Sequence, residues 1–223
     1  MSQSYKIFIP FYNSHSHMET LINSFIEYGY RDKIFFIDDG STDNSEEILI
    51  RMDIPYRRFS LNRGKGRIIK YIFEELIVGL DFFIIMDSDL QHRPSDLNKF
   101  ITTYRLSGKP VFGRRDLDSK DMPWDRKFSN KVTTKFLRFI TKKKIYDSQC
   151  GFRLYPSECV NDIVITTDRF ETESEIIIKL SRKGITFSYV DIPTIYNNNS
   201  SKISRLKDIY RFVKLAVRSL IIK

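Results

Sequence analysis

Polar and acidic residues gather at three points of the sequence, each directly after a short apolar run. The clusters are Pro10-Phe11-Tyr12-Asn13, Asp38-Asp39-Gly40-Ser41-Thr42-Asp43 and Asp87-Ser88-Asp89-Leu90-Gln91-His92. A carboxylate in such a place can hold Mg²⁺ or Mn²⁺ while the metal keeps open positions for phosphate oxygens. The alternative is that the aspartates form turns or cap helices, as Asp43 is expected to do before the helix predicted from residue 45.

The elements around these clusters alternate between apolar runs and amphipathic patterns. Strands are expected over residues 6–11, 33–37, 56–60 and 82–86, and helices over 17–28, 45–52 and 65–78. The run at 82–86 is apolar throughout, which is typical of a strand buried on both faces of a parallel sheet. Ligands bind beyond the carboxyl ends of such strands, and the three clusters lie at those ends.

The second half of the chain is less regular. Helices are expected over residues 94–106, 126–141, 173–183 and 204–222, and strands over 110–113, 151–154 and 186–190. The fold class is therefore α/β, with a mostly parallel central sheet, flanking helices and right-handed crossovers. One domain is expected over residues 1–203, followed by a C-terminal basic amphipathic helix over 204–223.

Composition limits the classes of protein and partner. The chain has 223 residues, 41% of them hydrophobic, and a net charge of +9. These values exclude a wholly disordered chain, a collagen and a coiled coil, and the basic surplus predicts an anionic partner. Two cysteines are too few for a disulfide framework. With no signal peptide or membrane span in the sequence, we expect a cytoplasmic protein, soluble or peripheral to a membrane.

Four motifs in this order resemble the family-two glycosyltransferases of GT-A fold. They are Pro10-Phe11-Tyr12-Asn13, Ile37-Asp38-Asp39-Gly40-Ser41-Thr42-Asp43, Asp87-Ser88-Asp89-Leu90-Gln91-His92-Arg93-Pro94 and Asp147-Ser148-Gln149-Cys150-Gly151-Phe152-Arg153-Leu154-Tyr155. The resemblance extends over roughly residues 5–207. It is strongest to the polyprenyl-phosphate sugar transferases, such as dolichyl-phosphate mannose or glucose synthases.

The resemblance implies a role for each matching residue. On the donor side, a nucleotide-sugar would contact Pro10, Tyr12, Asp38, Asp39, Lys65, Asp87 and Gln91. Mg²⁺ or Mn²⁺ would be bound by Asp87 and Asp89, with Asp89 the stronger ligand. The residues facing the transferred sugar would be Glu171 or Glu173, together with Arg114 or Arg115. The acceptor phosphate would contact Arg114, Arg153 and Lys202.

The implied reaction moves a hexose, from a donor of the GDP-mannose or UDP-glucose type, to a polyprenyl or dolichyl phosphate with inversion. The second pKa of such a phosphate is about 6, so the nucleophile is already ionised at neutral pH and needs no general base. One alternative is a sugar hydroxyl as acceptor, with Glu171 or Glu173 as the base. Another is a basic nucleic-acid-binding protein, which the acidic strand ends disfavour because they would repel phosphates. No nucleic-acid partner is therefore expected.

A lipid acceptor requires contact with a membrane. In the helix expected over 204–222, an apolar stripe lies beside Arg211, Lys214 and Arg218. A basic amphipathic helix of this kind can bind an anionic membrane at the cytoplasmic face. Alternatively the stripe packs on the back of the sheet, and a membrane-anchored partner subunit or the lipid itself recruits the chain.

Overall fold

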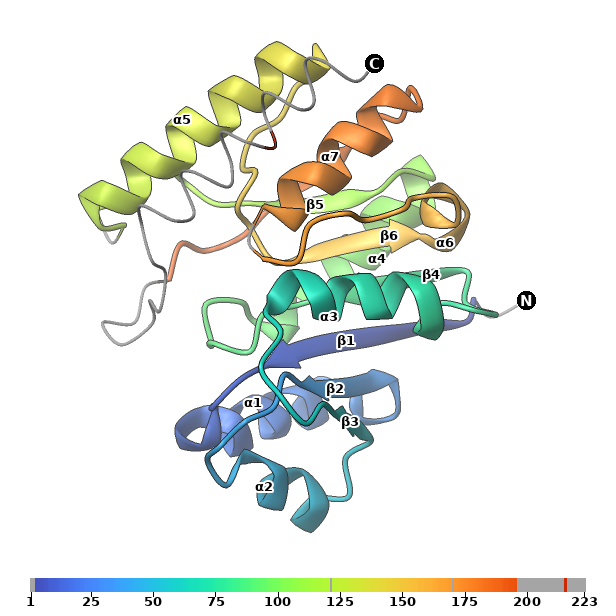
Figure 1. Ribbon diagram of the computed structural model, residues 1–223, viewed down its shortest axis with the longest axis vertical. Helices are drawn as coiled ribbons and strands as arrows, with labels where there is room; N and C mark the ends of the chain where they lie inside the picture. Colours follow the sequence, from blue (N-terminus) through green and yellow to red (C-terminus); the bar gives the residue numbers. More distant parts are fainter. Residues whose placement is uncertain (1–2, 121, 170, 196–214, 216–223) are drawn as a thin grey trace.

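A seven-stranded sheet in the order β3-β2-β1-β4-β6-β5-β7 forms the centre of the molecule, with helices on both faces (Figure 1). The computed structural model describes residues 3–120, 122–169, 171–195 and 215. The strands are β1 Tyr5–Phe11, β2 Ile34–Asp38, β3 Tyr56–Arg58, β4 Phe82–Ile85, β5 Val111–Arg114, β6 Arg153–Pro156 and β7 Ser188–Asp191.

The helices follow the predicted alternation. They are α1 His15–Glu27, α2 Ser45–Arg51, α3 Lys65–Tyr71, α4 Leu97–Ser107, α5 Trp124–Thr141, α6 Ser157–Val160 and α7 Thr172–Arg182, with short 3₁₀ turns at Arg31–Lys33 and Pro94–Asp96. The helix expected over 65–78 is confirmed, but it widens into a π-helical turn, η2, over Ile72–Leu76. Helix α6 was not predicted. The helix expected over 204–222, and with it the domain boundary at 204, lies outside the described residues apart from residue 215.

Strand directions confirm the predicted α/β class, and they include one reversal that the order of elements along the chain did not reveal. Strands β1, β2, β3 and β4 are parallel, and β5 is parallel to β7. Strand β6 is antiparallel to both β4 and β5. Because of this reversal, Arg153 at the start of β6 pairs with Ile85 at the end of β4. The segment 147–152 is thereby placed at the same edge of the sheet as Asp87.

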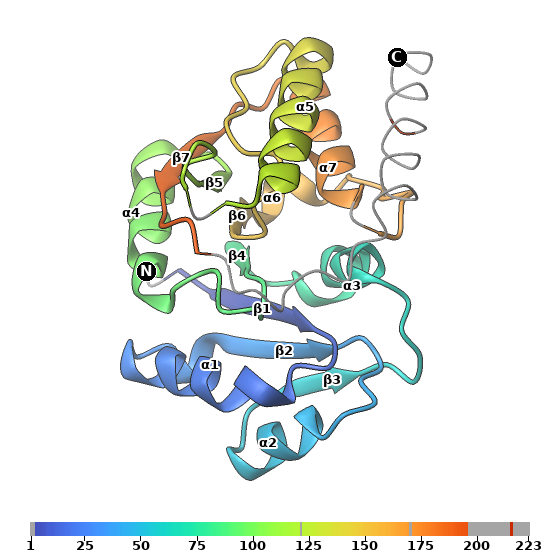
Figure 2. The ribbon, with the colours of Figure 1, turned by 90° about the vertical axis from the view of Figure 1, so that its left-hand side faces the viewer.

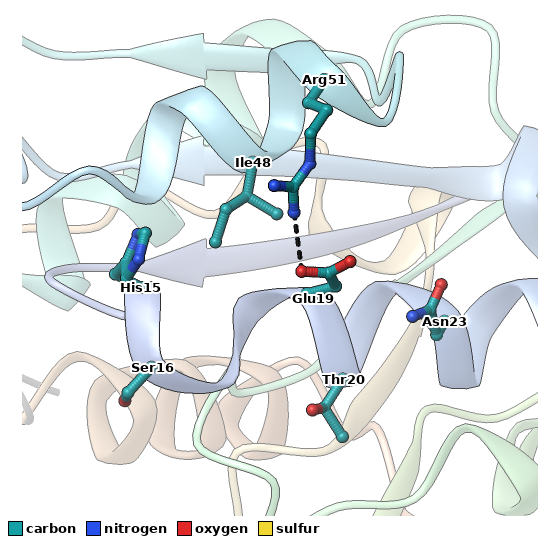
Figure 3. Close-up of a pocket in the computed structure, with 7 residues that line it drawn as sticks. All are labelled: His15, Ser16, Glu19, Thr20, Asn23, Ile48 and Arg51. Atoms are coloured by element: carbon teal, nitrogen blue, oxygen red, sulfur yellow. Dashed lines mark hydrogen bonds and ion pairs between the residues drawn. The ribbon is translucent and has the colours of Figure 1, made fainter.

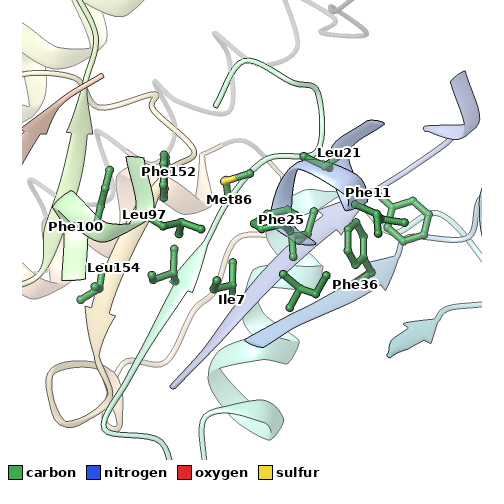
Figure 4. Close-up of a cluster of buried hydrophobic side chains, with 14 of the residues drawn as sticks. Ile7, Phe11, Leu21, Phe25, Phe36, Met86, Leu97, Phe100, Phe152 and Leu154 are labelled. Carbon is green, nitrogen blue, oxygen red and sulfur yellow. The ribbon is translucent and has the colours of Figure 1, made fainter. Parts of the chain in front are cut away.

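Two apolar clusters lie on opposite faces of the sheet, because successive strand side chains point to opposite sides. One cluster packs α1, α2 and α4 against β-strand residues that include Ile7, Phe36 and Leu154 (Figure 4). The other packs α3, η2, α6 and α7 against residues that include Phe8 and Phe83. Strand β4 contributes to both clusters and is buried along its whole length, which confirms the expectation for residues 82–86.

Strands β1, β2 and β4 run parallel, so their carboxyl ends lie on one side of the molecule, as Figure 2 shows for β1 and β2. Strand β5 ends on the same side because it runs parallel to β4 through the intervening β6. The predicted polar clusters therefore meet at this edge.

Candidate active site

Asp39 fastens the loop 61–64 to the carboxyl end of β2. Its two carboxylate oxygens accept hydrogen bonds from the backbone N–H groups of Arg63 and Gly64, each at 2.8 Å. Burial raises the pKa of Asp39 against the effect of these bonds. The neighbouring Gly40 has φ +73°, and a Cβ there would lie 2.6 Å from the backbone carbonyl carbon of Leu61. The close approach of the two loops therefore requires a glycine.

Asp38 is turned into the protein. Its side chain is fully buried and accepts a 2.7 Å hydrogen bond from the backbone N–H of Ser41, while Arg58 Nε lies 3.7 Å from its other oxygen. These contacts stabilise the turn after β2. The predicted donor contact of Asp38 does not fit this position, because its side chain is fully buried.

Asp43 caps helices, as expected. Its carboxylate accepts hydrogen bonds from the backbone N–H groups of His15, at 3.0 Å, and Ser45, at 3.1 Å. The starts of α1 and α2 are thereby held together.

Lys65 joins three elements at the site. Its ammonium nitrogen lies 2.6 Å from Asp87 Oδ1, after β4, and 2.7 Å from Glu173 Oε1, in the first turn of α7. Burial opposes the charge on Lys65, but the two carboxylates outweigh it and raise the pKa of the lysine. Burial likewise opposes ionisation of Asp87, and Lys65 outweighs it and lowers the pKa of that carboxyl. Lys65 and Asp87 are therefore both held in their charged forms.

Asp89 lies in a different electrostatic environment from Asp87. Its Oδ1 accepts a hydrogen bond from the backbone N–H of Gln91 at 3.1 Å. Burial, followed by repulsion from Asp87, raises the pKa of Asp89 to about 6. A carboxyl whose ionised form is disfavoured in this way would gain most from a bound cation.

The donor set at this edge suits Mg²⁺ or Mn²⁺ bound together with a diphosphate. Among the described residues, no group of three or more His, Cys, Asp or Glu side chains could hold a metal ion. Two neighbouring aspartates with a phosphorylated ligand match the preference of Mg²⁺ for few carboxylates, substrate phosphates and water. Lys65 already neutralises Asp87. Asp89 therefore remains the stronger of the two predicted ligands.

Gly151 lies against Asp87, and the sequence prediction missed its importance. A Cβ at this position would lie 2.0 Å from Asp87 Oδ2 and 2.4 Å from Asp87 Cγ. Only a residue without a side chain allows the 147–152 segment to pass this close to the carboxylate. The signal was present in the sequence, because Gly151 belongs to the fourth motif.

Arg114 and Arg115 point in different directions, which separates two residues that the sequence left as alternatives. Arg115 is buried and forms a two-pronged ion pair with Asp147, at 2.7 and 3.1 Å. Its charge acts on both Asp87 and Asp89. Arg114 instead pairs with Asp191 at the end of β7. Arg115 is the one near the aspartates.

Arg153 is an interior residue and not an exposed phosphate contact. It is 2% exposed, and its guanidinium donates to the backbone carbonyls of Ser148, Cys150 and Glu173 at 2.7, 2.8 and 3.1 Å. One of its nitrogens also lies 4.0 Å from the Glu173 carboxylate. The expected acceptor-phosphate role is corrected accordingly: Arg153 positions the 148–150 segment and the start of α7.

Five further residues were predicted for the site, and the structure describes four of them. Pro10 is buried in β1 beside Ile37, and Tyr12 is half-buried directly after that strand. Gln91 is buried beside Asp89, and Glu171 lies immediately before α7 with a buried Oε2 that has no hydrogen-bond partner among the described residues. Lys202 lies outside the described residues.

Arg169 adds a cation that the sequence prediction did not include. Its Nη1 lies 3.4 Å from Asn62 Oδ1, and its charge acts on Asp39. A Cβ on Gly64 would lie 2.5 Å from its side chain. Arg169 therefore covers the loop that Asp39 holds. Its only signal in the sequence is its place two residues before Glu171.

A hollow of about 450 Å³ lies elsewhere, between α1 and α2 (Figure 3). Its walls include Glu19 and Arg51, which form an ion pair of 2.6 Å. None of the predicted site residues lines it. The chemistry of the molecule is concentrated at the sheet edge and not in this hollow.

Relatives of this chain include two enzymes named for transfer of a sugar to dolichyl or dolichol phosphate. The chain is 26% identical over 219 residues to the UDP-N-acetylglucosamine–dolichyl-phosphate N-acetylglucosaminyltransferase of Methanococcus voltae, covering 87% of this chain and 86% of that one. It is 25% identical over 212 residues to the dolichol-phosphate mannosyltransferase of Pyrococcus furiosus, covering 90% and 58%.

A solved structure shares the fold. The glucosyl-3-phosphoglycerate synthase of Mycobacterium tuberculosis, in complex with Mn²⁺, UDP and phosphoglyceric acid, superposes with a TM-score of 0.74 at 15% identity. The match covers 99% of this chain and 78% of that one. At this identity the likeness supports the GT-A fold alone.

The model of glycosyl transferase family 2 matches residues 6–164, which is most of the chain and includes the three strand-end clusters as well as the Asp147–Tyr155 motif. The matched region thus contains both the strands β1 to β4 and the aspartates that follow β2 and β4. The chain belongs to glycosyl transferase family 2 and is a glycosyltransferase of GT-A fold.

Proposed function

We propose that the protein transfers a hexose from a nucleotide-sugar to a polyprenyl phosphate, with Mg²⁺ or Mn²⁺ as cofactor. The observation that carries the proposal is the continuous polar network from Asp87 through Lys65 to Glu173, in contact with the 147–153 segment at Gly151. Two relatives named for transfer to dolichyl or dolichol phosphate support the choice of acceptor.

The donor is expected to lie across the ends of β1 and β2. Tyr12 is half-buried directly after β1, where the backbone N–H of Asp39 donates to the carbonyl of Phe11 at 2.9 Å. The cation of Arg169 lies against the loop that Asp39 holds. An aromatic face suits a base, a carboxylate accepts from ribose or base donors, and an arginine suits a phosphate. The relatives named above differ in the sugar that they transfer, so the hexose is to be identified by testing a panel of nucleotide-sugars.

Asp89, assisted by Asp87, would hold the metal. When bound, the metal neutralises the charge that develops on the departing nucleoside diphosphate. Lys65 holds Asp87 in place through an ion pair, and Glu173 holds Lys65. Arg115, fixed by Asp147, adds a further positive charge near the aspartates. The cations of the chain itself thus favour an anionic leaving group.

The transfer needs no proton acceptor when the nucleophile is a phosphate. An oxygen of the ionised acceptor attacks the anomeric carbon, the bond from that carbon to the diphosphate oxygen breaks, and the electron pair leaves with the diphosphate. Attack from the face opposite the leaving group inverts the anomeric centre. Glu173 faces Lys65 and Arg153 and acts in this account as their counter-ion.

A sugar hydroxyl as acceptor is the second candidate, and one observation favours it. Such a hydroxyl must lose its proton, and Glu171 has a buried Oε2 without a hydrogen-bond partner among the described residues. Glu171 could accept that proton. Replacing Glu171 with Gln would then abolish transfer, whereas a phosphate acceptor would leave much of the turnover in place.

The test combines binding with transfer. Calorimetry would measure the affinity for a panel of nucleotide-sugars with and without Mn²⁺, and transfer would be followed to polyprenyl phosphate and to free glycans. Asp89→Asn is expected to remove the effect of Mn²⁺ on donor binding and to lower turnover by about 100-fold or more.

Asp53→Asn is the matched control, because Asp53 is fully exposed, follows α2 and belongs to none of the four motifs. It should leave binding and turnover unchanged. Transfer to glycans but not to polyprenyl phosphate would overturn the proposed acceptor. Mn²⁺-dependent turnover that survives in Asp89→Asn would overturn the metal site.

A further inference from the structure

Helix α5 (Trp124–Thr141) differs from an ordinary surface helix, because it buries polar side chains and exposes large apolar ones. Its face toward the protein carries Asn130, Thr133, Thr134 and Leu137, which are 0–7% exposed. The opposite face carries Trp124, Phe128, Val132 and Phe139, which are 49–77% exposed. The outward residues are spaced by four, four and seven positions, so they form one stripe along the helix. The rings of Trp124 and Phe128 stack at 5.7 Å within it.

This stripe differs from the scattered apolar residues elsewhere on the described surface. Residues such as Ile50, Val78 and Leu106 are also exposed, but they lie apart from one another, on α2, in the turn after η2 and on α4. Single exposed apolar side chains are normal on a soluble protein, whereas several large apolar side chains gathered on one helix face mark an interaction surface.

The charge around the stripe indicates what covers it. Residues 124–144 contain eight basic residues and one acidic residue, a net charge of +7 out of +9 for the whole chain. Lys131 and Lys135 are exposed, and Lys142 lies 4.3 Å from the ring centroid of Phe139. Asp118 pairs with Lys131 at 2.5 Å, and the other cations of the helix greatly outnumber it. An anionic partner with an apolar layer beneath its charges fits this pattern.

The inward face of α5 connects the stripe to the active site. Thr134 Oγ1 and Ser148 Oγ are 2.9 Å apart, and Gln149 Nε2 donates to Thr133 Oγ1 at 3.3 Å. Ser148 and Gln149 belong to the segment that contacts Asp87 through Gly151. A surface resting on the outer face of α5 would therefore lie about one helix diameter, about 10–12 Å, from the site segment.

We propose that the outer face of α5 docks on an anionic lipid bilayer, with Trp124, Phe128, Val132 and Phe139 in the headgroup–acyl boundary and the lysines at the phosphates. An amphipathic helix binds in this way by lying in the plane of the interface. No described helix is long and apolar enough to span a bilayer. The inference rests on the proposed function, since a polyprenyl phosphate would be met in the headgroup plane.

Trp124 provides a reporter at the predicted contact, because it is the one tryptophan of the chain. The full chain would be titrated with vesicles that contain no polyprenyl phosphate, made either of phosphatidylcholine alone or of phosphatidylcholine with phosphatidylglycerol. We expect co-sedimentation with the anionic vesicles and a blue shift of Trp124 emission. Both should reverse at about 1 M salt, where the screening length is about 3 Å.

Two double variants test the stripe. Phe128→Ser with Phe139→Ser is expected to lower vesicle partitioning at least about tenfold, since two aromatic side chains no longer enter the interface. The matched control, Ile50→Ser with Leu106→Ser, removes two apolar residues of similar exposure from α2 and α4 and should partition as the unchanged protein does. Equal losses in both variants would overturn the proposal.

The remaining outcomes are equally decisive. Vesicle binding without a change in Trp124 emission would place the membrane contact elsewhere and overturn the proposal. A blue-shifted Trp124 without vesicles, with a dimer in sedimentation, would mean that a second copy covers the stripe. Transfer to a short, water-soluble isoprenyl phosphate without vesicles separates the two hypotheses. If that transfer occurs and vesicle binding does not, the proposed function stands and the docking surface fails.

Discussion

Replacing Gly151 with Ala should inactivate the enzyme through one contact. The added Cβ would lie 2.0 Å from Asp87 Oδ2 and 2.6 Å from Asp87 Oδ1, whereas real Cβ atoms essentially never approach below 3.0 Å. The carboxylate must therefore move by at least about 1 Å, or the segment must move away from it. The ion pair of 2.6 Å between Asp87 and Lys65 would then lengthen beyond normal hydrogen-bonding distance.

The expected size of the effect follows from this displacement. A misplacement of about 1 Å at a reacting centre costs about 100-fold in turnover. Overpacking of a close contact costs about 1–3 kcal/mol of stability. Gly151 has no positive φ, so the alanine backbone itself is not strained. The loss of turnover should therefore exceed what the loss of stability explains.

Gly113→Ala is the matched control. Its Cβ would lie 2.7 Å from Cys150 Sγ and 2.8 Å from Ile192 Cδ1, so it overpacks the interior without touching a carboxylate. Stability would be measured by urea unfolding, and turnover and donor KM with polyprenyl phosphate as acceptor. If the two variants lose turnover in the same proportion to stability, the contact with Asp87 does not matter for the reaction.

Three further predictions concern residues whose environments the structure defines. Arg153→Met leaves buried carbonyls and Glu173 without their cation and should cost about 3–5 kcal/mol in urea unfolding. Donor and acceptor affinity should fall together, and a loss confined to the acceptor would restore Arg153 as a phosphate contact. Burial opposes ionisation of Glu175, but bonds from Lys179 and two threonines outweigh it and lower the pKa of the carboxyl. The stabilising effect of ionised Glu175 is therefore present above the ordinary pKa of 4.5 and is lost as the pH falls below it. Glu175→Gln should reduce the slope of the melting temperature against pH in acid, and an unchanged slope would contradict this. In Asp39→Asn, the new amide NH₂ group would point at one of the two backbone N–H groups that the carboxylate now accepts from. Because two donors then face each other, nucleotide-sugar binding should weaken about tenfold in calorimetry. Unchanged affinity would remove Asp39 from the donor site.

The sequence was sufficient for the secondary-structure elements, and it predicted where the chemistry lies. Alternating apolar runs and helical periods are local properties, and they predicted the strands and most helices within a few residues. The aspartates that follow the strands ending at Asp38 and Ile85 had to lie at the carboxyl edge of a parallel sheet once that sheet was assumed. The motifs also sufficed for the family, because their order along the chain does not depend on how distant segments pack.

The tertiary structure decided which of these residues work together. Lys65 and Glu173 are 108 positions apart, and no local pattern indicates that they share a hydrogen bond. The antiparallel direction of β6 brings Gly151 to Asp87 and turns Arg153 inward. Arg114, the last residue of β5, and Arg115, which follows it, point in different directions and have different partners.

Helix α5 shows the same division of information. Its sequence predicted a basic helix over residues 126–141, and the structure has that helix starting two residues earlier, at Trp124. Both its polar and its aromatic side chains follow a helical period, so periodicity alone could not say which face is buried. That choice depended on Ser148 and Gln149, which form hydrogen bonds with the threonines of α5. These two residues reach α5 only after the sheet has formed. Local periodicity thus specifies secondary structure, whereas contacts across long separations depend on strand order and direction.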